Sequence, residues 1–212
     1  MKIVTENYQI SNERLPVSGQ YIIGHQNEGE IVVYQAYKPS IAAFAVNNQI
    51  LGGSEFSYNR MSWIKPNFLW MMYRCGWAEK ENQERVLALW INKKALEAIL
   101  DHAVFSSFDA RYYASREMWR SELDTKEIRL QWDPDHDPYG NKLTRKAIQL
   151  GLKGDSLEEF GKHKINLVED ITDFVREQKM HVNNNQLDKL SIPLERVWEP
   201  GNLLKQKIGI TG

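Results

Sequence analysis

The 212-residue chain is short of cysteine, of long apolar runs and of any excess charge. Its one cysteine, Cys75, cannot form an internal disulfide, so we expect the protein in a reducing cytoplasm. No uncharged apolar run approaches the ~18 residues of a membrane span, and the first ten residues lack a signal peptide's apolar stretch, so we predict no membrane association. Lys and Arg number 27 against 28 Asp and Glu, which excludes a polybasic protein but allows a local basic site.

The residues present are those of one folded domain. Hydrophobic residues make up 42% of the chain, and 11% are aromatic, including seven Trp. This length predicts a single domain over residues 1–212. Residues 183–212 are polar and rich in Asn and Lys, and we expect this segment to wrap around the rest of the domain or to be partly loose. The mixture of short strand and helix patterns predicts an α+β fold, with a mixed, mostly antiparallel sheet flanked by short helices.

Hydrophobic periodicity and capping residues predict the elements. Alternation in the run IVVYQAY should place Val32 and Tyr34 on one face of a strand, and Gln35 and Tyr37 on the other. Asn166 with Glu169 resembles a capping box and predicts the start of a helix. Strands are expected at 19–25, 31–37, 60–65, 85–91, 127–133 and 145–152, and helices at 39–48, from 66 to about 75, from Asn92, from Ser115, from Asp155 and from Asn166.

The segment RMSWIKPNFLWMMYRCGW, residues 60–77, carries the most information about function. It contains five aromatic and three cationic side chains and no acidic one. In one interpretation Arg60, Lys65 and Arg74 bind phosphate, while Trp63 and Trp70 stack on a ring. In the other, the segment is a tryptophan-rich core helix, and a largely buried Arg74 pairs with an internal carboxylate.

Two further segments contain candidate polar groups. Tyr34, Gln35 and Tyr37 could orient a ligand or simply cap a sheet edge. QWDPDHDPYGN opens like a calcium loop but has Pro138 and Thr144 where such a loop has Gly and Glu, so we predict an acidic turn and no metal site. Asp133 or Glu84 is the candidate acid or base for catalysis.

Five segments of the sequence resemble the bacterial and fungal domain-of-unknown-function family 4291. They are VYQAYKPSIA, RMSWIKPNFLWMMYRCGW, QERVLALWI, LQWDPDHD and RKAIQLGL. The resemblance extends from about Ile22 to Arg196 and implies a free-standing intracellular domain, but it supplies no activity. Cys75 stands where the family usually has Ser, which weakens the case for a catalytic thiol. The family's motif residues correspond to Tyr34, Gln35, Tyr37, Arg60, Trp63, Lys65, Trp70, Arg74, Trp77, Gln131, Trp132, Asp133 and Gln149.

A looser resemblance concerns the order of elements. A strand with a polar face, a short helix ending in Gly-Gly and a strand leading into an aromatic helix are similar to ADP-ribosyltransferase-like domains. That resemblance implies a split sheet that holds NAD, with Tyr34-Gln35 and Ser62-Trp63 near two of the family's three motif positions. Neither pair matches the family's residues well, and Glu84 and Glu127 are the candidates for its glutamate.

We therefore expect a protein that binds a nucleotide or the end of a nucleic acid through phosphate, as an enzyme with a transferase-type pocket. The first alternative is a non-enzymatic module that recognises a nucleotide, modified base or peptide. The second is a structural or regulatory protein with no small-molecule site. An acid-free group of cations in a chain of net charge −1 suits a compact anion site better than a long nucleic-acid track.

Overall fold

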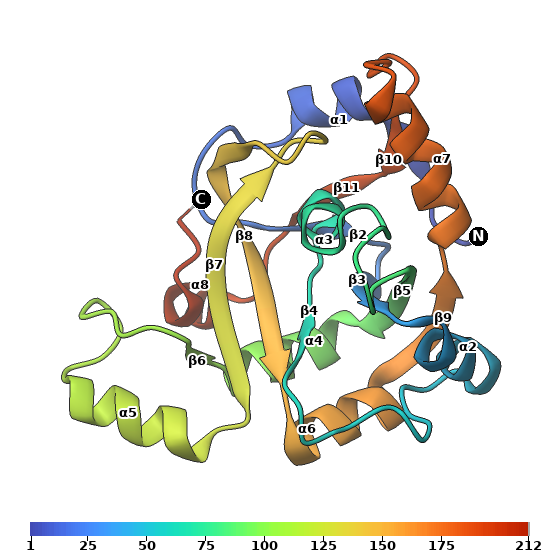
Figure 1. Cartoon of the computed structure of the whole chain (residues 1–212). Coiled ribbons are helices and arrows are strands. Elements are labelled where there is room, and N and C mark those ends of the chain that lie inside the picture. Colours follow the sequence, from blue (N-terminus) through green and yellow to red (C-terminus); the bar gives the residue numbers. More distant parts are fainter. Residues whose placement is uncertain (212) are drawn as a thin grey trace.

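The computed structural model describes residues 1–211, in which short helices alternate with strands (Figure 1). The helices are α1 (Tyr8–Arg14), α2 (Pro39–Asn48), α3 (Phe68–Cys75), α4 (Lys93–Asp101), α5 (Arg116–Thr125), α6 (Gly154–Glu159), a π-helical turn (Phe160–Lys164), α7 (Thr172–Asn183) and α8 (Asn202–Ile208). The strands are β1 (Thr5–Asn7), β2 (Ile22–His25), β3 (Glu30–Tyr37), β4 (Ser62–Ile64), β5 (Arg85–Asn92), β6 (Val104–Phe105), β7 (Ile128–His136), β8 (Lys142–Leu152), β9 (Ile165–Asp170), β10 (Ser191–Pro193) and β11 (Glu195–Trp198).

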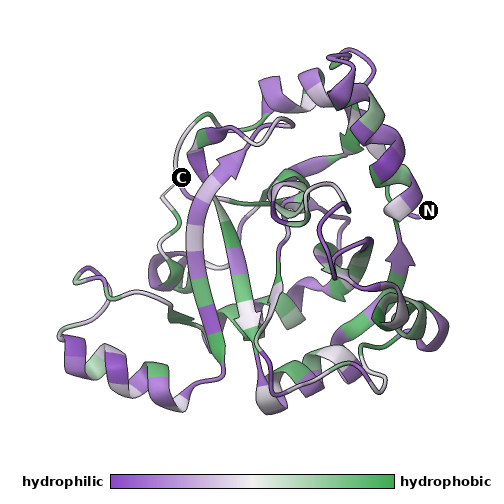
Figure 2. Ribbon diagram, in the orientation of Figure 1, coloured by the Kyte–Doolittle hydropathy of each residue, from purple (hydrophilic) through white to green (hydrophobic). Residues whose placement is uncertain are grey.

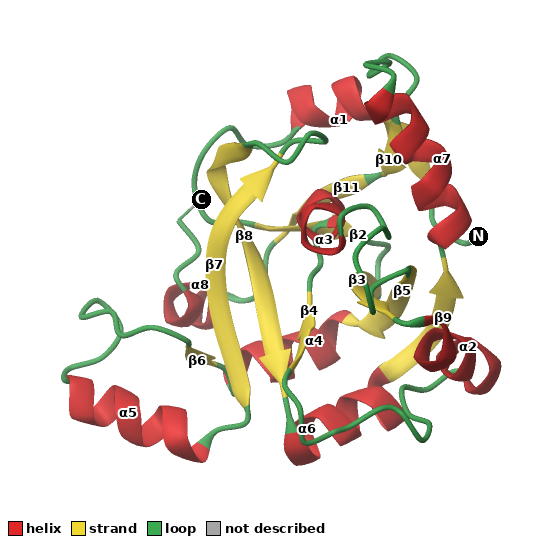
Figure 3. Ribbon diagram, in the orientation of Figure 1, coloured by secondary structure: helices red, strands yellow, loops and turns green. Residues whose placement is uncertain are grey.

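The strands form two larger sheets and two small ones. The larger sheets have the orders β3-β5-β9 and β4-β8-β7-β6, and the small ones are β1-β10 and β11-β2. Neighbouring strands are antiparallel except for β6, which runs parallel to β7. This arrangement, with helices around the sheets (Figure 3), confirms the predicted α+β class and the mixed, mostly antiparallel pairing.

The two larger sheets meet at one point. The Tyr34 amide of β3 donates to the Lys65 carbonyl over 2.7 Å, and the Lys65 amide donates back to the Tyr34 carbonyl over 3.2 Å. In the described chain β3 and β4 belong to different sheets on either side of this bridge. Beyond this bridge the two strands diverge into their separate sheets.

Strands β3 and β5 are buried on both faces of their sheet. As its alternation predicts, β3 places Ile31 and Val33 in one apolar cluster, and Val32 and Tyr34 in another. The first cluster fills the space between the two larger sheets, and the second packs against α3 and α7. Figure 2 shows the apolar residues on these inner strands, whereas α5 at the edge of the molecule is mostly hydrophilic.

Helix α3 lies between the two larger sheets and contacts both β3 and β7 (Figure 1). The helix expected from 66 to about 75 begins at Phe68 and ends at Cys75: the Asn67 side chain accepts from the Trp70 amide over 2.7 Å at its start, and Gly76 follows it with φ 60°. The carboxyl group of Glu195 also accepts from the Phe68 amide over 2.7 Å. These contacts satisfy amide groups that the first turn of a helix leaves unpaired.

The helix predicted from Asn166 is wrong. Residues Ile165–Asp170 form β9, which pairs with β5 and completes the sheet. The helix begins six residues later at Thr172, whose amide donates to the Asp170 side chain over 2.9 Å. Asn166 and Asp170 both suit the start of a helix, and the structure uses Asp170, four residues later.

The C-terminal segment covers the N-terminal part of the chain. Strands β10 and β11 pair with β1 and β2. Trp198 and Ile208 are buried, and the Trp132 indole donates to the Ile208 carbonyl over 2.7 Å. Within residues 1–211, no helix is both long and apolar enough to cross a membrane.

Candidate functional site

A cavity of about 500 Å³ lies where β3 and β4 diverge. We call it the split-sheet cavity. Arg60, Lys65 and Arg74 all line it, although fourteen positions of sequence separate the first from the last. Its other lining residues are Gln35, Ala36, Tyr37, Lys38, Ile41, Glu55, Phe56, Ser57, Met61, Ser62, Trp63, Met71, Asn82 and Gln83.

A side-chain network spans the gap between the two strands. The Gln35 amide of β3 donates to Ser62 Oγ of β4 over 2.7 Å, and the Tyr37 hydroxyl lies 2.9 Å from the same oxygen. Burial raises the pKa of Tyr37 to about 12, so its phenol stays neutral at physiological pH. The serine hydroxyl is thus fixed by two groups of the other sheet, and all three residues line the cavity.

Lys65 is the unusual residue of the site. Only 1% of its surface is exposed, and its ammonium group donates one hydrogen bond, to the Trp63 carbonyl over 3.1 Å. No carboxylate within residues 1–211 forms an ion pair with it. Burial, and next the positive charge of Arg74, lower the pKa of Lys65 to about 7. Strongly shifted groups of this kind gather at functional sites.

The two arginines are exposed. In the described chain neither Arg60 nor Arg74 forms an ion pair or donates a side-chain hydrogen bond. Arg74 does not have the buried position that the core-helix interpretation gives it: α3 buries its other faces, and its Tyr73–Arg74 edge faces solvent. Both guanidinium groups therefore retain their full capacity to bind an anion.

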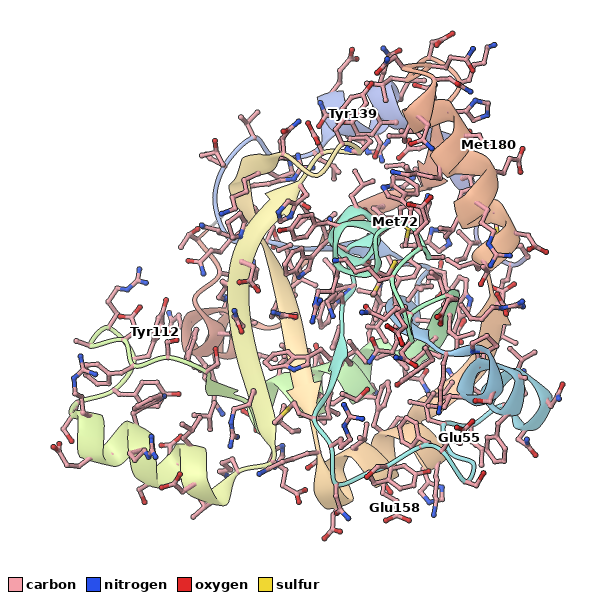
Figure 4. All side chains as sticks on the ribbon, viewed as in Figure 1. Glu55, Met72, Tyr112, Tyr139, Glu158 and Met180 are labelled. Carbon is pink, nitrogen blue, oxygen red and sulfur yellow. The ribbon has the colours of Figure 1, made fainter. Side chains whose placement is uncertain are left out.

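Cationic side chains outnumber acidic ones around the cavity. Lys38, Arg60, Lys65 and Arg74 line it, and Glu55 is the single carboxylate among its lining residues. Figure 4 shows Glu55 beside α2, where its carboxylate is bound by Lys38 and Ser40. The surroundings of Arg60, Lys65 and Arg74 are therefore electropositive.

The loop between α3 and β5 closes one side of the cavity. Trp77, Ala78 and Asn82 have φ values of 56°, 68° and 62°, a region that non-glycine residues rarely occupy. Asn82 lines the cavity, and its amide donates to Glu84 Oε1 over 2.8 Å. The candidate acid Glu84 thus lies just outside the lining residues and holds this strained turn.

Asp133 belongs to a neighbouring cluster. Gln131 and Gln149 face each other across β7 and β8, and their amides donate to the two carboxylate oxygens of Asp133 over 2.8 and 2.7 Å. None of the three lines the split-sheet cavity. Gln131 instead lines a second cavity of about 360 Å³ beside Phe105 and Tyr112. Asp133 is still close enough for its charge to oppose the lowering of the Lys65 pKa.

Tyr34 and Trp70 lie away from the cavity. Tyr34 is fully buried on the opposite face of β3, with its ring 5.6 Å from that of Phe68. Trp70 stacks on Tyr73 and on His136. The aromatic walls are Trp63, Tyr37 and Phe56.

Trp63 is held by close packing. A Cβ atom added at Gly151 would lie 2.5 Å from Met61 Sδ and 3.0 Å from Trp63 Cε2, so glycine gives the indole its space. The sequence did not single out Phe56, Asn82, Gln83 or Lys38 as site residues. Lys38 and Gln83 stand in two of the family's segments, but no pattern marked these four residues as part of a site, and only the fold brings them to the cavity.

The acidic segment after Trp132 is structural. Strand β7 continues through it to His136, so the turn begins later than predicted, at Asp137, whose side chain accepts from the Tyr139 and Asn141 amides. Asp135 and Arg145 form a buried ion pair at 2.6 Å. No cluster of three His, Cys, Asp or Glu in residues 1–211 could hold a metal ion.

Comparison with protein families matches residues 21–198 to the Domain of unknown function (DUF4291). The chain belongs to this family. The match includes every residue that lines the split-sheet cavity, as well as the Asp133 cluster, and it confirms the resemblance carried by the motif of residues 60–77. No curated protein matches the chain. The function of this DUF4291 domain must therefore be inferred from its site.

Proposed function

We propose that the split-sheet cavity binds a phosphate-bearing ligand, a nucleotide or the end of a nucleic acid, and that the domain is an enzyme with a transferase-type pocket. The observation that carries this proposal is that Arg60 and Arg74 line one cavity together with Lys65, and that neither arginine has a carboxylate partner among residues 1–211. Guanidinium groups bind phosphate oxygens through paired hydrogen bonds, which suits them to this ligand.

The cavity also offers a place for a ring. Trp63, Tyr37 and Phe56 supply aromatic surfaces beside the cations, and Gln35 and Ser62 supply polar groups that could orient a base or a nicotinamide. A volume of about 500 Å³ is that of a small-molecule pocket. The ligand is therefore a mononucleotide, a dinucleotide such as NAD, or a terminal nucleotide, and not a long strand.

The transferase proposal is supported by the position of the cavity. An opening between two sheets that touch at the single Tyr34–Lys65 bridge is what the resemblance to ADP-ribosyltransferase-like domains implies. In this proposal Asp133 or Glu84, which lie outside the lining of the cavity, supplies the acid or base. The buried thiol of Cys75, whose pKa burial raises, supports an inert cysteine and a cytoplasmic location.

The alternative is a module that binds the same ligand without turnover. It is favoured by one observation: Glu55, the one carboxylate that lines the cavity among residues 1–211, is bound by Lys38 and Ser40. Incubation of the protein with NAD, followed by measurement of free nicotinamide, separates the two. Release of nicotinamide supports the enzyme, and binding of NAD with no release supports the module.

Binding itself is tested by thermal shift and titration calorimetry with AMP, ADP, NAD and 5′-phosphorylated oligonucleotides. We expect at least one of them to raise the melting temperature, because a ligand at ~100 times its Kd adds ~2.7 kcal/mol to stability. Arg74→Ala should weaken that ligand about tenfold or more, since a charge-assisted hydrogen bond contributes ~1.5–3 kcal/mol.

The matched control is Arg120→Ala, which removes another exposed arginine, one on α5 that pairs with Asp124 and lies outside the lining of the cavity. It should leave the affinity unchanged. Equal affinity of the Arg74→Ala variant and the wild type, with both proteins folded, would contradict the proposal.

A further inference from the structure

The environment of Lys65 is poorly suited to an anion-binding lysine. Arg60 and Arg74 already supply two fixed positive charges to the cavity, and both are exposed. Lys65 lies deeper, almost completely buried, without a carboxylate partner among residues 1–211. Burying a third cation beside two others is costly, and the cost is avoided when the amine is neutral.

A neutral, buried amine beside other cations is the arrangement that activates lysine as a nucleophile. The single hydrogen bond from Lys65 Nζ to the Trp63 carbonyl fixes the direction of the side chain. An amine in this state keeps its lone pair for attack on a carbon atom. The lowered pKa of Lys65, about 7, supports a neutral form near physiological pH.

We propose that Lys65 forms a Schiff base with an aldehyde or ketone whose phosphate or carboxylate group is bound by Arg60 and Arg74. The inference rests on the anion site of the proposed function and adds a reacting group to it. The neutral Nζ attacks the carbonyl carbon and a C–N bond forms. The carbonyl oxygen then leaves as water with the two amine hydrogens, so a C=N bond replaces C=O and no electrons are exchanged with another reactant.

The other lysines of this region provide an internal comparison. Lys38 lines the same cavity, but its ammonium group is paired with Glu55. Lys80 lies nearby and donates to the Tyr73 and Arg74 carbonyls over 3.3 and 2.8 Å. Both are exposed or paired cations, so neither should react as Lys65 does.

The test is labelling with pyridoxal 5′-phosphate and cyanoborohydride at pH 7.5, followed by peptide mass spectrometry. We expect modification of Lys65 at least about tenfold faster than of Lys38 or Lys80, because an ordinary lysine amine is only about 0.1% neutral at this pH. Pyridoxal, which lacks the phosphate, should label Lys65 more slowly, and so should the phosphate compound with the Arg74→Ala variant. Label confined to surface lysines would overturn the inference.

The outcomes separate this inference from the proposed function. If AMP or NAD binds in an Arg74-dependent manner but Lys65 is not labelled, the Schiff base is excluded and the anion site stands. If neither occurs, both proposals fall. Lys65→Arg should abolish the label at this position, and because Arg74→Ala changes an exposed residue, it tests the same chemistry even if the Lys65 variant does not fold.

Discussion

At the scale of a single residue, Lys65 makes the free energy of unfolding depend on pH. Its pKa falls from 10.5 to about 7 on folding, so the unfolded chain binds the proton more tightly than the folded one. The buried lysine therefore destabilises the folded protein. This destabilisation is greatest below pH 7 and shrinks as the pH rises from 7 toward 10.5. That drop in pKa corresponds to about 5 kcal/mol at most.

Replacement Lys65→Met should accordingly stabilise the protein by several kcal/mol at pH 6, because it removes the buried charge and keeps the length of the side chain. The gain should shrink between pH 7 and pH 9. Urea unfolding at pH 6, 7.5 and 9 measures it, with Lys38→Met as the control for a half-buried, paired lysine. A stability difference that is independent of pH would show that Lys65 is not the shifted group.

At the scale of an element, Glu195 positions α3. Its carboxyl group is buried and accepts from the Phe68 amide at the start of the helix that carries Arg74. Burial raises the pKa of Glu195 well above its usual range, so the folded protein holds it protonated where the unfolded chain is ionised. Stability from this group is present below about pH 4.5 and is lost as the pH rises toward the folded-state pKa.

We predict that Glu195→Gln keeps the hydrogen bond to the Phe68 amide and gains stability relative to wild type as the pH rises from about 4.5 to 7. Glu195→Ala should instead lose about 1–3 kcal/mol, because it leaves the amide unsatisfied. Chemical denaturation of both variants at pH 4.5 and 7 makes the comparison. Equal losses for Gln and Ala would mean that the carboxyl group does not hold the helix.

The elements that could be predicted are those with local signals. The helix expected from 66 to about 75 is α3, and alternation along β3 gave its two faces correctly. The helix expected from Asn166 failed because β9 is specified by its pairing with β5, a partner more than seventy residues away in sequence. Strands β1, β10 and β11 escaped prediction for the same reason, since each has at most four residues and depends on a distant partner.

At the scale of the whole molecule, the site depends on the place where β3 and β4, strands of two different sheets, diverge. The motif of residues 60–77 was enough to nominate Arg60, Trp63, Lys65 and Arg74, and all four line the split-sheet cavity. Its residues Trp70 and Trp77 are core residues instead. No local pattern showed that Asp133, Gln131 and Gln149 would form a cluster of their own, because that depends on the register of β7 and β8.

Hydrogen exchange of the whole domain, with and without a saturating nucleotide identified by thermal shift, tests the central claim most directly. If the ligand occupies the split-sheet cavity, exchange should slow in the two loops that border it, residues 56–62 and 80–84. Residues 106–112, which line the second cavity beside β6, should exchange unchanged. Protection of residues 106–112 with no change in the other two segments would place the ligand elsewhere and contradict the account.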